Sequence, residues 1–231
     1  MRAILHANLI KLTTLPLNWA AGTGALLWGG LLGWVAAANA RASAAGSLAA
    51  APAADPAALL AILLPLLPAG VVVATATILG AEFGPVLRST LAATPDRRVL
   101  TAARALSTGA VAGVLSAGSA VAAWGAARLA GHALGGGIAL RLALYLLACA
   151  ALAALLTDAT RSLPRGALIT LAALWIAPVA INAIRPAWRI YLPMHDVAAR
   201  LFSPAAALPW TSLACLVLAG AWAVLSWRRD L

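Results

Sequence analysis

The chain has 231 residues, of which 64% are hydrophobic and only 10% are charged. Soluble globular proteins carry about 45–50% apolar and about 25% charged residues, so this chain has too few polar residues to cover a soluble surface. Lys and Arg number 16 against 6 Asp and Glu. These basic residues stand singly or in pairs between apolar runs, whereas nucleic-acid binding uses a continuous basic patch. We therefore expect a lipid bilayer as the partner, and no nucleic acid.

Residues 1–16 precede the first long apolar stretch and predict an amphipathic elbow helix on the inner membrane surface. Ile4 and Leu5 lie on its apolar face, whereas Arg2 lies opposite. The segment lacks the continuous apolar core of a signal peptide, so we expect no cleavage. Pro16 ends the predicted helix.

Charged residues mark the limits of the membrane spans, because a charge at the bilayer centre costs about 2.5–3.5 kcal/mol. A span needs about 20 apolar residues, and six uncharged stretches approach or exceed this length. We predict an all-α integral membrane protein, one transmembrane domain over residues 1–231. The predicted spans are 19–39, 57–81, 105–127, 138–157, 167–184 and 210–227. The fourth span begins before Arg141, whose side chain would extend toward the membrane surface.

Small residues between Gly109 and Gly125, including Gly109-x-x-x-Gly113, predict a helix-packing surface. Pro65, Pro68 and Pro178 lie within spans, where neighbouring helices can satisfy the carbonyls that proline frees. We interpret them as kinks in preference to gating hinges. Five tryptophans fall near predicted span ends, where the headgroup layer favours indole rings: Trp19, Trp34, Trp124, Trp210 and Trp227.

The distribution of basic residues favours an orientation with both termini in the cytoplasm. The segments that would then lie inside hold Arg2, Lys11, Arg88, Arg97, Arg98, Arg104, Arg161, Arg165, Arg228 and Arg229. Those outside hold Arg41, Arg128, Arg141, Arg185, Arg189 and Arg200. Segment 185–209 is then a long outer loop, and its aromatic and charged residues suit the membrane interface.

The inner loop 82–98 is the strongest local signal. Pro85 suits the first turn of a helix and Pro95 ends it. Four apolar residues share one face of this short helix, which is therefore amphipathic: Phe83, Val86, Leu87 and Leu91. It is either an interfacial connector between two spans or a contact element for a cytoplasmic partner, and the physical argument favours neither.

A family resemblance bears on this choice. Glu82-Phe83, then Arg88-x-Thr90-Leu91-x-x-x-Pro95-x-Arg97, continuing through Val99-Leu100 to Arg104, resembles the permease subunits of type-two ABC exporters. Six spans, an N-terminal elbow helix and a long outer loop before the last span are similar too. The specific residues occupy only 82–104, whereas the layout covers the whole chain.

The resemblance implies a permease that forms the export pathway with a second copy or a paralogue. Separate ATPase subunits would bind ATP and Mg²⁺ and push on the loop 82–98 as a coupling helix; this chain would hold no cofactor or metal of its own. The residues implied in coupling are Glu82, Phe83, Val86, Leu87, Arg88, Leu91, Pro95 and Arg97. A carboxylate at the membrane boundary needs a basic partner, and we expect Arg88 or Arg104 to provide one for Glu82.

We expect no enzymatic activity in this chain. It lacks the G-x-x-x-x-G-K-[ST] loop that cradles ATP phosphates, and Ser116 is not in a rhomboid-like G-x-S-G motif. Asp158 and Arg161 are expected to pair at the inner surface. The alternatives to an exporter are a non-ABC transporter or importer membrane subunit, and a structural or assembly protein of the membrane.

The sequence also bears on location and cargo. Heavy Ala and Arg usage hints at a GC-rich bacterium, and hence at a multi-pass protein of the bacterial plasma membrane. Spans rich in Ala, Leu, Val, Gly and Trp suggest a lipidic or amphipathic cargo such as a drug, a peptide antibiotic or a lipid, but lipid-facing helices have the same composition. The substrate stays open.

Overall fold

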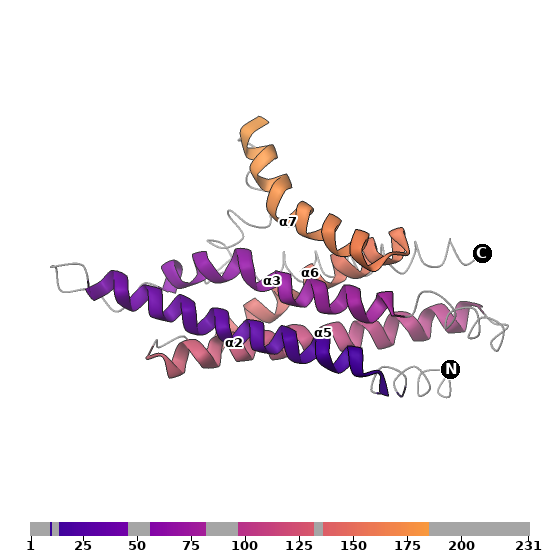
Figure 1. The fold of residues 1–231 in the computed structure, drawn as a ribbon, viewed down its shortest axis with the longest axis horizontal. Helices are drawn as coiled ribbons and strands as arrows, with labels where there is room; N and C mark the ends of the chain where they lie inside the picture. Colours follow the sequence, from indigo (N-terminus) through magenta and orange to yellow (C-terminus); the bar gives the residue numbers. More distant parts are fainter. Residues whose placement is uncertain (1–9, 11–13, 46–55, 82–96, 132–135, 185–231) are drawn as a thin grey trace.

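The computed structural model describes residues 10, 14–45, 56–81, 97–131 and 136–184, which form helices joined by short turns, with no strand among them. Figure 1 shows the arrangement of the long helices. They are α2 (Pro16–Ala45), α3 (Pro56–Gly80), α5 (Arg97–Leu129), α6 (Gly136–Thr160) and α7 (Leu163–Ile184). The all-α prediction is confirmed for these residues, because the first five predicted spans coincide with helices, apart from Ala81 just after α3.

Other predicted elements lie outside the described residues. These are most of the elbow helix 1–16, the loop residues 82–96, the outer loop 185–209 and the sixth span 210–227. At the last residue of the predicted elbow, Pro16, the structure begins helix α2. Proline suits the first position of a helix, where its missing N–H has no partner to lose.

Four segments are long and apolar enough to cross a membrane: Pro16–Asn39, Leu63–Gly80, Ala105–Leu129 and Gly136–Thr160. A shorter apolar stretch, Leu163–Ile176, opens α7. Large apolar side chains also point outward from the bundle, among them Leu27, Val114 and Leu168. Soluble monomers rarely expose extended apolar patches, so the described helices have the surface of a membrane protein.

Four helices are longer than their predicted spans: α2, α5, α6 and α7. Helix α5 begins at Arg97, eight residues before the predicted limit at Ala105. Its 33 residues extend for about 50 Å at 1.5 Å per residue, whereas the apolar core of a bilayer is about 30 Å thick. Charges mark the edge of the apolar layer and not the end of the helix. Arg97, Arg98 and Arg104 therefore lie within α5, although they precede the predicted span.

Successive helices alternate in direction (Figure 1). The starts of α2, α5 and α7 and the ends of α3 and α6 lie together, and we call this the loop end because residues 82–96 join α3 to α5 there. The opposite end, where α2 and α5 finish, is the far end. Successive membrane crossings require this alternation, because each helix starts on the side of the membrane where the preceding helix ended.

Helix α3 is the central helix of the bundle, since it packs against α2, α5, α6 and α7. Its buried side chains join those of α2, α5, α6 and α7 in one core. The largest side chains that are fully buried there are Leu63, Leu67, Val71, Val72, Leu142 and Leu146. A displacement of α3 therefore acts directly on each of the other described helices.

Helices α2 and α5 approach closely through a glycine motif, Gly29-x-x-x-Gly33. A Cβ atom at Gly29 would lie 2.7 Å from the Ser119 carbonyl oxygen, and one at Gly33 would collide with the backbone of Ala123. Ser119 also donates a hydrogen bond of 3.3 Å to the carbonyl of Ala25 across this interface. Small residues at such spacing allow two backbones to meet, which is a principal way for membrane helices to associate.

The predicted packing motif on α5 is wrong in its details. Positions Gly109 and Gly113 have nothing within 4 Å of a Cβ atom built on them. The contacts of this segment with α2 come instead from Leu115, Gly118, Ser119 and Ala123. The composition of 109–125 indicated a packing helix correctly, but the Gly109-x-x-x-Gly113 spacing did not identify the residues that contact α2.

Candidate functional site at the loop end

The predicted coupling residues meet the described structure only at their boundary. Glu82, Phe83, Val86, Leu87, Arg88, Leu91 and Pro95 lie outside the described residues. Arg97 is the first residue of α5, and its backbone is described. The two ends of this loop are held by α3 and α5, whose residues are described.

The first attachment point is the end of α3, which lies against the start of α7. A Cβ atom at Gly80 would lie 2.6 Å from the Cβ of Leu163. The amide of Ala81 still donates to the carbonyl of Thr77 at 3.0 Å, so the helical hydrogen bonding of α3 continues to this contact. A displacement at the last turn of α3 would act on α7 through Leu163 as well as along α3 itself.

The turn between α6 and α7 is held by local hydrogen bonds. The hydroxyl of Thr160 donates to the carbonyl of Leu156 at 2.8 Å, and Arg161 adopts a left-handed φ of 47°. One turn into α7, Gly166 packs directly on Thr157, and the hydroxyl of Thr170 donates to the Gly166 carbonyl at 2.7 Å. The turn thus joins α6 and α7 closely beside the end of α3.

Most of the buried polar side chains of the described residues lie in the half of the bundle nearest the loop end. They are Asn18, Thr75, Ser107, Thr108, Thr157, Asp158 and Thr170, whereas Ser116 and Ser119 lie further along α5. The hydroxyl oxygens of Thr75 and Thr157, and that of Ser116 further along α5, have no hydrogen-bond partner in the described part of the chain. A buried hydroxyl without a partner is costly, so this half of the bundle is the part best suited to meet water or a polar group.

Asp158 is the only acidic residue among those described, and it is 9% exposed. The prediction placed it at the inner surface in an ion pair with Arg161. Arg161 is exposed, so the two side chains have different surroundings, and the described structure shows no ion pair between them. The left-handed backbone at Arg161 ends the helical register that the predicted spacing of one turn assumed.

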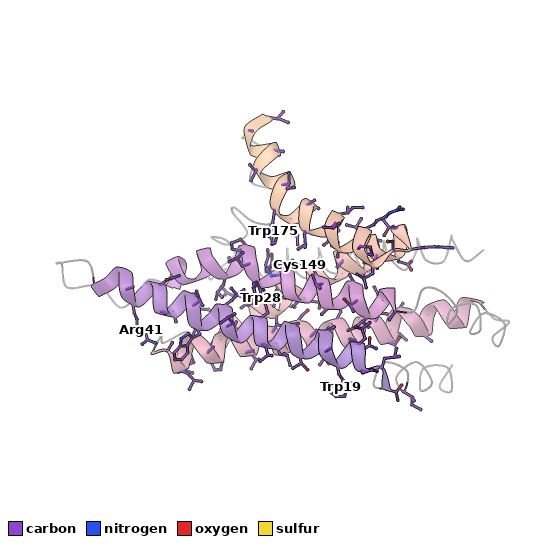
Figure 2. The ribbon with its side chains drawn as sticks, in the orientation of Figure 1. Trp19, Trp28, Arg41, Cys149 and Trp175 are labelled. Atoms are coloured by element: carbon purple, nitrogen blue, oxygen red, sulfur yellow. The ribbon has the colours of Figure 1, made fainter. Side chains whose placement is uncertain are left out.

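Three aromatic side chains surround a pair of prolines in the far half of α3. Tyr145 of α6 donates its hydroxyl to the Leu64 carbonyl at 3.3 Å. Trp175 of α7 donates its indole N–H to the Pro65 carbonyl at 2.7 Å. Trp28 of α2 donates to the next carbonyl, that of Leu66, at 3.0 Å. Figure 2 shows Trp175 between α7 and α3, and Trp28 between α2 and α3.

These three donors are not among the residues predicted from the sequence. The sequence pattern predicts interfacial tryptophans near span ends, and Trp19 and Trp34 are indeed exposed there. Trp28 and Trp175 lie away from the ends of their helices, where anchoring at the membrane surface does not explain an indole. A tryptophan far from both ends of a span needs a buried acceptor, and two prolines in the neighbouring span were the available signal.

Among the described side chains, no group of three or more His, Cys, Asp and Glu residues could hold a metal ion. Cys149 is a buried cysteine of α6 that forms no disulfide. Comparison with protein-family models, with curated proteins and with solved structures found no match for this chain.

Proposed function

We propose that the chain is the membrane-spanning permease subunit of an ATP-driven exporter. Separate ATPase subunits would act on the loop between α3 and α5 from the cytoplasm, and a second permease copy or paralogue would complete the pathway. The proposal rests on the sequence pattern at 82–104 and on the positions of the two helices that this loop joins.

The observation that carries the proposal is the central position of α3. This helix leads into the loop at Gly80 and packs against α2, α5, α6 and α7. A push on residues 82–96 would therefore act on a helix that packs against all the others described, and through Leu163 on the start of α7. A rigid helix that moves between packed neighbours is an established way to transmit a local force.

The length of α5 supports the same function. Its first turns carry Arg97, Arg98 and Arg104 and extend beyond the apolar length that a bilayer requires. The loop would therefore be held away from the lipid, where a cytoplasmic ATPase has access to it.

The direct test is co-purification with the ATPase encoded beside the gene, followed by measurement of ATP turnover in lipid nanodiscs. We expect a stable complex, and we expect Glu82→Gln and Leu91→Asp to reduce permease-stimulated turnover at least fivefold. Leu129→Asp is the matched control for Leu91→Asp, because Leu129 is 84% exposed at the far end of α5. Absence of a complex, or equal turnover in all variants, would contradict the proposal.

A non-ABC transporter is the second candidate, and the burial of Asp158 favours it. Ionisable residues within membrane bundles often serve as ion or proton sites. Asp158 lies next in sequence to Thr157, whose hydroxyl has no partner among the described residues. This candidate predicts that no ATPase associates and that proton uptake into proteoliposomes is lost in Asp158→Asn but not in Glu82→Gln.

A further inference from the structure

The strongest feature that the coupling hypothesis does not use is the proline pair of α3. Pro68 has no backbone N–H, so the Leu64 carbonyl, four residues earlier, loses its helical donor. Tyr145 supplies a replacement donor to that same carbonyl. In a membrane a freed carbonyl must be satisfied by a neighbour, and here the neighbour is identified.

The next two carbonyls also receive side-chain donors, from different helices. Successive residues of an α-helix are rotated by about 100°, so the carbonyls of Leu64, Pro65 and Leu66 face different sides of α3. Tyr145 of α6, Trp175 of α7 and Trp28 of α2 meet them there. The segment Pro65–Pro68, which we call the proline break, is thus hydrogen-bonded to three surrounding helices.

The three donors differ in how firmly they are held. Tyr145 is 3% exposed, within the core of the bundle. Trp28 is partly buried, and its ring fills the space that Gly70 leaves by lacking a Cβ atom, which would lie 2.7 Å from the indole Cδ1. Trp175 is 38% exposed, so it has the fewest packing contacts to keep its donor in place.

Trp175 also marks a boundary within α7. Leu174, one residue earlier, is buried in the core, whereas three large apolar residues that follow are exposed: Ile176, Val179 and Ile184. Figure 1 shows the second half of α7 diverging from the other helices. Among the described residues, the indole of Trp175 is therefore the last polar contact between α7 and the bundle.

We propose that the Trp175–Pro65 hydrogen bond is a releasable contact that sets the angle between the second half of α7 (Ile176–Ile184) and α3. Release leaves an indole N–H without an acceptor, which is unfavourable in hydrocarbon. The contact therefore holds until water or another acceptor reaches this side of α3. Movement of the second half of α7 away from α3 is thereby coupled to the arrival of water at Pro65. This coupling does not depend on whether an ATPase drives the protein.

The test measures the distance between spin labels at Val179 of α7 and Leu140 of α6, both exposed, in a chain with Cys149 and Cys215 replaced by alanine. Labels at Leu31 of α2 and Val121 of α5 provide a control pair on helices joined by the glycine motif. We expect one dominant Val179–Leu140 distance in the parent. Trp175→Phe keeps an aromatic ring but removes the N–H, and should increase a longer-distance population at least threefold.

Two further variants make the result specific. Trp34→Phe removes an exposed tryptophan and should leave both distances unchanged. Benzothienylalanine at position 175 keeps the shape of the indole, with sulfur in place of N–H, so it decides the question even if Trp175→Phe fails to fold. A Val179–Leu140 distribution that matches the parent in the benzothienylalanine protein would overturn the proposal, as would an equal shift in Trp34→Phe.

Discussion

Gly29 of α2 and Ser119 of α5 lie where the two helix backbones meet, so close that a Cβ atom at Gly29 would be 2.7 Å from the Ser119 carbonyl oxygen. This contact requires that residue 29 has no side chain. Membrane helices gain little from burying apolar groups away from lipid, which is itself apolar. Close backbone packing of this kind therefore contributes much of the energy that holds the bundle together.

The first prediction concerns this interface. Gly29→Val should destabilise the folded protein by about 1–3 kcal/mol, the usual effect of overpacking a tight contact. Gly30→Val is the matched control, because a Cβ atom at Gly30 meets nothing within 4 Å. Thermal unfolding in detergent, followed by size-exclusion chromatography, should show a lower Tm for Gly29→Val alone. Equal Tm values for the two variants would contradict the close packing of α2 on α5.

The second prediction tests whether Tyr145 compensates for Pro68. Tyr145→Phe should cost about 0.5–1.5 kcal/mol, the net value of one hydrogen bond. Pro68→Ala returns a backbone N–H to the Leu64 carbonyl, so Tyr145→Phe should cost at most half as much in that background. Free energies of unfolding in mixed micelles for the four proteins provide this comparison. An equal loss in both backgrounds would mean that Tyr145 does not replace the missing donor.

The proline break shows what the sequence could and could not predict. Charge spacing located five helices, because the cost of burying a charge limits every span. The prolines within α3 predict that neighbouring helices supply donors to the freed carbonyls. Tyr145, Trp175 and Trp28 do so. Which neighbours supply these donors depends on how each helix is rotated and on the order of the helices in the bundle. Almost uniformly apolar sequences carry little periodic signal for rotation or for order.

The same limitation explains the wrong packing motif. Gly109 and Gly113 have the spacing of an interface, but so have Gly29 and Gly33, and spacing alone does not say which pair faces another helix. The coupling residues from Glu82 to Pro95 lie outside the described structure, so their role stays a prediction. For Asp158, the spacing to Arg161 can be read from the sequence, whereas the left-handed turn that separates their surroundings cannot.

The third prediction concerns the turn between α6 and α7. Gly166→Val should collide with Thr157 and separate the two helices, at a cost of about 1–3 kcal/mol. Gly137→Val at the start of α6 is the control, since nothing lies within 4 Å of a Cβ atom there. Limited proteolysis should cleave Gly166→Val faster near Arg161 and Arg165, whereas Gly137→Val should resemble the parent. Protection of both variants to the same degree would argue against the tight turn.

The account depends above all on a bundle that crosses the membrane with its loop end in the cytoplasm. Single cysteines at Arg161 and Leu129, both exposed and at opposite ends, test this in a chain without Cys149 and Cys215. A membrane-impermeant maleimide added to intact cells should modify the cysteine at position 129 and leave position 161 unmodified until the cells are permeabilised. Modification of position 161 in intact cells, or of both positions equally, would contradict the account.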